Sequence, residues 1–288
     1  MTSQKHLYLH NRNRLRDVSS FDPDLRRFER LWIDRVLASD ASAMSAVTTC
    51  DQLLDRIDQR VQWEAQHETE ESRYVREAMT RPEFRILVQE FALDGLTEAQ
   101  SFYYIMPRLP LTAQLPMLRI LIDEFGSANP QRMHTTLYVN LLRELDMTTA
   151  PEPYLDLISE AGFAFVNQFY WMTIRADDPS WFAGAITYLE SAIPHFFPCY
   201  VAACERLGIR AHHYYSEHCH IDRFHALEGR RLLAAMNRER ALDPGKAWQG
   251  VCLASTITAQ AFTDAVHKAR ANRWPGQPQE PRHEHSAA

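Results

Sequence analysis

Apolar residues recur at helical spacing in one segment of this chain after another. Between positions 22 and 38, and again between positions 50 and 68, large apolar side chains return every three or four residues, as they do on one face of an α-helix. Only 9 glycines occur in 288 residues, and no glycine-punctuated run alternates in the manner of a strand. We therefore predict an all-α protein.

Capping residues and prolines predict where some of these helices begin and bend. Thr97 has the position of an N-cap, which would place Glu98 in the first turn of a helix. Pro194 and Pro198 each lack a backbone N–H inside a long apolar segment. We expect that helix to kink just after Glu190.

The length permits one large domain or two modest ones. No internal repeat and no domain-scale linker divides the chain, so we predict one domain over residues 22–272. Residues 1–21 are polar and basic and are expected to form a flexible N-terminal arm. Residues 273–288, rich in proline and charge, are expected to form a disordered tail.

Composition narrows the class of protein. The net charge is −6 with acids and bases interspersed, whereas nucleic-acid binders usually carry a basic face. The first residues lack the apolar stretch of a signal peptide, and no run is long enough to cross a bilayer. The cysteines are odd in number and form no CxxC pair, which is typical of reduced thiols. We expect a cytoplasmic protein with neither nucleic acid nor membrane as a partner.

Metal-binding residue types are concentrated between positions 218 and 225. On a helix, His218, Asp222 and His225 would stand at i, i+4 and i+7, within one narrow stripe. Two imidazoles and a carboxylate suit iron, manganese or zinc. Cys219 and His220 would point away from the stripe. The local pattern leaves a metal site and a hydrogen-bonded polar core both open.

A single helix cannot enclose a metal, so further ligands must come from elsewhere. The best candidates on predicted inward faces are Glu98, Glu124, His134 and Glu190. Each has an alternative structural role, such as a first-turn acid or an ion pair. Buried carboxylates are costly unless they are paired or metal-bound. Diiron bundles gather such residues from several helices, although the pair of Glu-x-x-His motifs found in ferritin-like bundles is missing from this sequence.

Taken in order, these motifs resemble the haem-oxygenase-like diiron oxidases and oxygenases, a family of iron-containing redox enzymes. The resemblance spans roughly residues 80–235 and rests on Leu96-Thr97-Glu98-Ala99-Gln100, Asp123-Glu124-Phe125-Gly126, His134, Glu190 and His218-x3-Asp222-x2-His225. It implies a haem-oxygenase-like helical bundle, here with additional N- and C-terminal helices, that binds two Fe²⁺ ions and no haem. The implied ligands are Glu98, His134, Glu190, His218, Asp222 and His225, with Glu124 as an extra carboxylate ligand found in some members.

The resemblance also implies O₂ as co-substrate, a small-molecule substrate and an external reductant. Some members of the family oxygenate the nitrogen of amines or guanidines, some cleave C–C bonds in amino acids or fatty acids, and others serve in cofactor assembly. The extra carboxylate, Glu124, favours N-oxygenation of a small amine, guanidine or amino acid in specialised biosynthesis. Oxidative C–C cleavage is the alternative. A homodimer is left open.

Two alternatives belong to other classes of protein. A metal-free helical binding or scaffold protein on the same fold would use the polar cluster as a hydrogen-bonded core. A haem oxygenase would carry its proximal histidine on the first helix, and residues 22–38 contain none.

A substrate pocket would lie beside the metals. Its candidate lining residues are aromatic, although aromatic side chains at helical spacing are also common in plain cores; they are Phe102, Tyr103, Phe169, Tyr170 and Phe224.

Overall fold

A computed structural model describes residues 3–14 and 22–272, and every regular element in these two ranges is a helix. The α-helices are α1 (Gln4–Arg14), α2 (Pro23–Ser39), α3 (Cys50–Gln66), α4 (Glu70–Glu77), α5 (Arg81–Glu90), α6 (Ala92–Thr97), α7 (Leu111–Glu124), α8 (His134–Glu144), α9 (Glu160–Tyr170), α10 (Ser180–Phe196), α11 (Pro198–Arg206), α12 (His213–Arg238) and α13 (Pro244–Ala271). Shorter helical turns are η1 (Ala41–Met44), η2 (Gln100–Arg108), η3 (Gly126–Ala128), η4 (Glu152–Asp156) and η5 (Trp171–Arg175), the last with π-helical geometry. The prediction of an all-α fold is confirmed.

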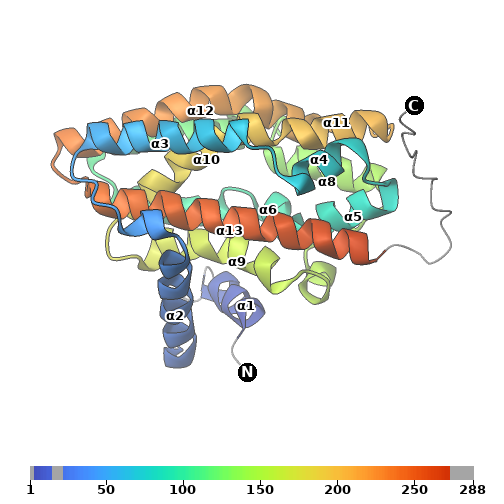
Figure 1. Ribbon diagram of the computed structural model, residues 1–288, viewed down its shortest axis with the longest axis horizontal. Helices are drawn as coiled ribbons and strands as arrows, with labels where there is room; N and C mark the ends of the chain where they lie inside the picture. The colour runs from blue at the N-terminus through green and yellow to red at the C-terminus, as the bar shows by residue number, and fades with distance from the viewer. Residues whose placement is uncertain (1–2, 15–21, 273–288) are drawn as a thin grey trace, which may run out of the picture.

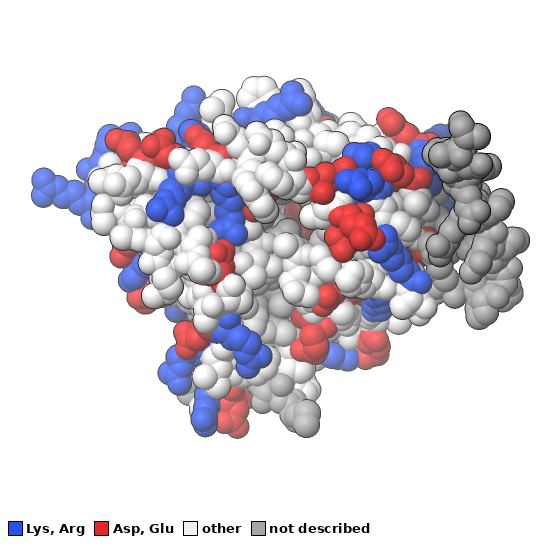
Figure 2. Space-filling model, viewed as in Figure 1, with Lys and Arg blue, Asp and Glu red and all other residues white. Residues whose placement is uncertain are grey.

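Three long helices form the centre of the bundle. Helix α10 packs against both α12 and α13, and α13 runs across the molecule between α3 and α9 (Figure 1). None of the described helices is both long and apolar enough to traverse a lipid bilayer. On the face shown in Figure 2, acidic and basic side chains alternate without a continuous basic patch.

Glycine allows α10 and α13 to approach closely. A Cβ on Gly184 of α10 would overlap the backbone carbonyl of Ala247, and a Cβ on Gly250 of α13 would overlap that of Trp181. Only glycine therefore fits at either side of this crossing. The close approach fixes the position of α10, which carries Glu190 one and a half turns further along.

The N-terminal segment is more ordered than predicted. Residues 4–14 of the expected arm form α1, which packs on α9 and buries Leu7, Tyr8 and Asn11. The amide of Asn11 donates a hydrogen bond to Asn167 Oδ1 at 2.9 Å. These three residues share one side of the helix, so a short apolar stripe anchors a mostly polar segment. Residues 15–21 of the arm and the tail, 273–288, lie outside the described residues.

Two helix boundaries also differ from prediction. Thr97 ends α6 instead of capping a new helix, because its hydroxyl donates back to the Leu93 carbonyl at 2.6 Å. Glu98 consequently lies at the junction of α6 and η2. The break in the α10 segment comes at Phe197, later than the kink expected after Glu190, because the chain restarts with Pro198 in the first turn of α11.

Candidate metal centre

The predicted stripe on α12 faces the interior. His218, Asp222 and His225 are 5%, 0% and 0% exposed, respectively. Cys219 is partly buried and His220 is exposed, as their angular positions require. Helical spacing alone therefore placed all five side chains on the correct sides of α12.

The other four predicted residues converge on this stripe from four different elements. Glu98, Glu124, His134 and His218 offer ligand atoms that lie within 4.8 Å of one another. Glu124, Glu190 and His225 form a second group by the same measure. Residues as far apart in the sequence as Glu98 and His225 thus lie in one cluster.

Glu124 is shared by the two groups. Its Oε2 lies 2.8 Å from His134 Nδ1, and its Oε1 lies 3.8 Å from His225 Nδ1. Glu124 is the last residue of α7, and Gly126 follows with a φ of +62° that turns the chain toward α8. That turn brings His134, the first residue of α8, back beside Glu124.

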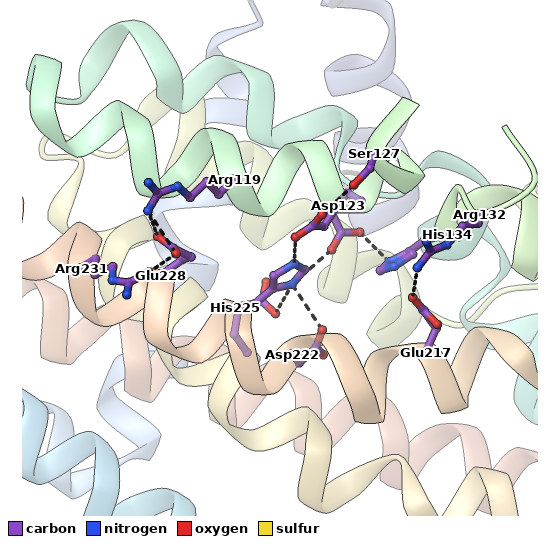
Figure 3. Close-up of polar contacts among 12 residues, drawn as sticks. Arg119, Asp123, Ser127, Arg132, His134, Glu217, Asp222, His225, Glu228 and Arg231 are labelled. Atoms are coloured by element: carbon purple, nitrogen blue, oxygen red, sulfur yellow. Dashed lines mark hydrogen bonds and ion pairs between the residues drawn. The ribbon is translucent and has the colours of Figure 1, made fainter. Parts of the chain in front are cut away.

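Asp222 lies next to the second group. Its Oδ1 is 3.4 Å from His225 Nδ1 (Figure 3). The same nitrogen is also 3.2 Å from Glu190 Oε2. Both Asp222 carboxylate oxygens and His225 Nε2 are buried without a hydrogen bond in the described chain. Buried polar atoms of native proteins are nearly always satisfied, and a cation would satisfy these.

The charges of the cluster shift one another's protonation. Although burial alone would lower the pKa of His218, Glu98 and Asp222 raise it to about 10. Burial would likewise lower the pKa of His225, but Glu190 and Asp222 raise it to about 11. Burial and the neighbouring Asp222 carboxylate raise the pKa of Glu190 to about 7. Without a metal, the imidazoles thus supply positive charge to the carboxylates.

Surrounding residues orient the ligand candidates. His218 Nδ1 lies 2.7 Å from the Tyr214 backbone carbonyl, which leaves Nε2 facing Glu98 Oε1 at 3.7 Å. The Tyr214 hydroxyl donates to Glu98 at 3.3 Å. Such outer contacts fix ring orientation in metal sites. Ion pairs between Arg119 and Glu228 hold α7 against α12 beside the centre (Figure 3).

Sequence reasoning missed two of these neighbours. Tyr214 stands one helical turn before His218, a spacing that could have indicated its role. Asp123 Oδ2 lies 3.5 Å from His225 Nε2, and its side chain also accepts a hydrogen bond from Ser127 at 3.0 Å (Figure 3). Asp123 adjoins Glu124 in the motif that carried the family resemblance.

A cavity of about 130 Å³ lies beside the cluster and is lined by Glu98, Glu124, Glu190 and His218. Phe102, Phe169 and Tyr170, three of the predicted pocket residues, line it as well.

The other two predicted pocket residues lie outside this cavity. Phe224 is 55% exposed, because it stands two residues after Asp222 and so about 200° around α12. Tyr103 is 45% exposed, and its ring packs 5.9 Å from that of Phe125. The prediction was wrong for both residues, since aromatic character alone does not determine which side of a helix faces inward.

The donor set fits iron. Three imidazoles and four carboxylates supply the nitrogen and oxygen ligands that iron accepts, with no thiolate among them. Buried oxygens without partners, inward-facing imidazoles and an adjoining cavity are the features expected of a metal centre that meets a small molecule.

Comparisons with known proteins agree with this geometry. A crystal structure of a domain of unknown function with a heme oxygenase-like fold, from Shewanella denitrificans, superimposes with a TM-score of 0.56. It is 15% identical, and the match covers 78% of this chain and 95% of that one, which shows the fold. The comparison with curated proteins found no match. The family model of iron-containing redox enzymes matches residues 85–258, more than half of the chain. The chain therefore belongs to the family of iron-containing redox enzymes.

Proposed function

We propose that this protein is a non-haem diiron oxygenase that uses O₂ to oxygenate a nitrogen of a small amine, guanidine or amino acid. Family membership gives the coarser statement, an iron-dependent oxidoreductase. The main support for two ions is Glu124, whose two carboxylate oxygens face different groups of ligand candidates. A carboxylate in that position is suited to bridge two metals.

Charge supports the same number of ions. Glu98, Glu124, Glu190 and Asp222 together carry four negative charges when ionised, and neutral imidazoles add none. Two divalent ions would neutralise this buried charge with every imidazole neutral and able to bind metal. With one ion, two negative charges would remain to be balanced by protonated imidazoles, which cannot act as ligands.

Iron held by such ligands would supply the reduction of O₂. In an N-oxygenation, one oxygen atom of O₂ goes to the substrate nitrogen and the other leaves as water. That balance needs two electrons and two protons from outside the substrate, so an external reductant belongs to the proposal. The apolar walls of the cavity, including Phe102 and Phe169, exclude bulk water from the reaction.

The choice of N-oxygenation rests on the extra carboxylate. Glu124 resembles the additional ligand of N-oxygenating relatives, and it lies inside the cluster and not at its edge. Glu124→Gln removes one charge and leaves the shape of the side chain. We expect that variant to lose N-oxygenated product before it loses all iron.

The first experiment is anaerobic loading with Fe(II), removal of loosely bound metal, and optical monitoring after mixing with O₂. We expect about two irons per chain and a transient visible absorption band. Products from amines, guanidines and amino acids are then analysed by mass spectrometry for one added oxygen atom. No retained iron and no response to O₂ would refute the proposal, and loss of a carbon fragment from the substrate would replace N-oxygenation with C–C cleavage.

A further inference from the structure

The cavity beside the metal centre contains one acidic side chain that the metal centre does not use. Asp94 lines this cavity, yet it belongs to neither group of ligand candidates. It lies in α6, four residues before Glu98, and both residues line the cavity. Asp94 is therefore beside the reaction site and outside the ligand set.

The Asp94 carboxylate is partly buried, and among the described residues only burial and neighbouring charges, with no hydrogen bond, act on it. Thr258 also lines the cavity, and its Oγ1 is buried without a hydrogen-bond partner among the described residues. An acidic group and a hydroxyl are thus both available to something that enters. Burial and the neighbouring Glu98 raise the pKa of the Asp94 carboxyl well above its usual range, which a bound cation would reverse.

The rest of the cavity wall favours a cation over an anion. The described lining residues include no lysine and no arginine, and the only basic one is His218, a ligand candidate. Aromatic residues from the α5–α6 junction and from α9 also line the cavity: Phe91, Phe165 and Tyr170. Cations are attracted to the faces of aromatic rings, whereas a substrate carboxylate would meet acids and find no basic partner.

We propose that Asp94 is the specificity-determining residue that anchors a cationic nitrogen of the substrate, an amino or guanidino group on a short apolar chain. This inference rests on the proposed function. The cavity of about 130 Å³ limits the substrate to on the order of ten non-hydrogen atoms. A nitrogen must be neutral when it is oxygenated, so the proton of a bound ammonium or guanidinium group passes to an Asp94 oxygen; in a diamine, the second amino group reacts in its neutral form while the ammonium group stays bound.

The test is calorimetric binding of three probes of one length, n-hexylamine, 1-hexanol and hexanoate, to the anaerobic Fe(II)-loaded protein. We expect the wild type to bind n-hexylamine at least about tenfold more tightly than either other probe. Asp94→Asn should weaken n-hexylamine binding by roughly tenfold to a hundredfold and leave 1-hexanol almost unchanged, because a charge-assisted contact is lost. Asp34→Asn, an exposed carboxylate on α2, is the matched control and should bind all probes as the wild type does.

The outcomes separate the two proposals. Equal n-hexylamine affinity in the wild type and Asp94→Asn, with iron content and reaction with O₂ retained, would overturn the role of Asp94 and leave the proposed function intact. If the wild-type protein takes up no iron but still binds n-hexylamine selectively through Asp94, the proposed function is refuted and the role of Asp94 stands. If Asp94→Asn does not fold, as judged by circular dichroism, the wild-type series decides: preference for hexanoate or 1-hexanol refutes the inference.

Discussion

At the scale of single residues, Asp222 is the ligand candidate that its protein environment satisfies least. It is completely buried, its Oδ1 lies 3.4 Å from His225 Nδ1, and neither carboxylate oxygen has a hydrogen-bond partner among the described residues. A side chain that served only as a core hydrogen-bond acceptor would have found a donor. A cation between α12 and the carboxylates opposite would explain its position.

Asp222→Ala should therefore abolish iron-dependent O₂ consumption and leave helicity almost unchanged. The expected loss in rate is at least about a hundredfold, since removing a ligand damages the site directly. O₂ uptake with an electrode and far-ultraviolet circular dichroism measure the two quantities. His220→Ala, on the exposed side of the same helix, is the control and should retain most of the activity. Full turnover in Asp222→Ala would exclude Asp222 from the centre.

At the scale of helices, the crossing of α10 and α13 holds the bundle together. Each helix presents a glycine to the backbone of the other, Gly184 against Ala247 and Gly250 against Trp181. A similar approach brings Gly229 of α12 against Thr187 of α10. Glu190 and the α12 stripe are placed by these contacts as much as by their own sequence.

Gly184→Ala should destabilise the fold by roughly 1–3 kcal/mol, because the added methyl group forces two helix backbones apart. The midpoint of urea unfolding measures the loss. The control is Gly245→Ala in the first turn of α13, where the nearest atom to a new Cβ would lie 3.3 Å away. That change should have a smaller effect or a stabilising one, since alanine favours helix over glycine. Equal losses at the two positions would disprove the role of the crossing.

The sequence predicts local features of the site better than the packing between distant helices. The stripe on α12 followed from local spacing, because the period of a helix decides which side chains share a face. The meeting of Glu98, Glu124 and Glu190 did not follow from spacing, since it depends on how distant helices pack; it came from resemblance to a family. Asp94 was missed because one acid on a six-residue helix gives no periodic signal.

At the scale of the whole molecule, the candidate centre joins segments that are far apart in sequence. Residues 98 and 225 mark its limits, and α6, α7, α8, α10 and α12 each meet there. The cavity lies where two apolar clusters adjoin. Its lining includes Phe102, which packs against Phe182 in the first cluster, and Tyr200, which belongs to the second. An ion bound at this place would connect both halves of the core.

Fe(II) loading without O₂ should therefore stabilise the entire fold. At about 100 times the dissociation constant, a ligand of the folded state adds about 2.7 kcal/mol, which corresponds to a rise of roughly 4–5 °C in Tm for a chain of this size. Differential scanning calorimetry measures it, and a chelator should reverse it. His225→Ala should show a much smaller rise; an equal rise would locate the iron elsewhere.

If the centre holds two ions, as proposed, the two oxygens of Glu124 have a further consequence for how metal uptake proceeds. Since one carboxylate faces both groups, neither group would then fill independently of the other. Thermodynamic reciprocity then requires that whatever factor the first ion imposes on the affinity of the second is imposed equally in return. Two opposing effects decide whether that factor strengthens or weakens binding of the second ion. A carboxylate already oriented by one ion helps the next to bind, whereas repulsion between like charges opposes it. At limiting iron, the first case yields empty and full molecules with few in between, and the second yields a population that is mostly half filled.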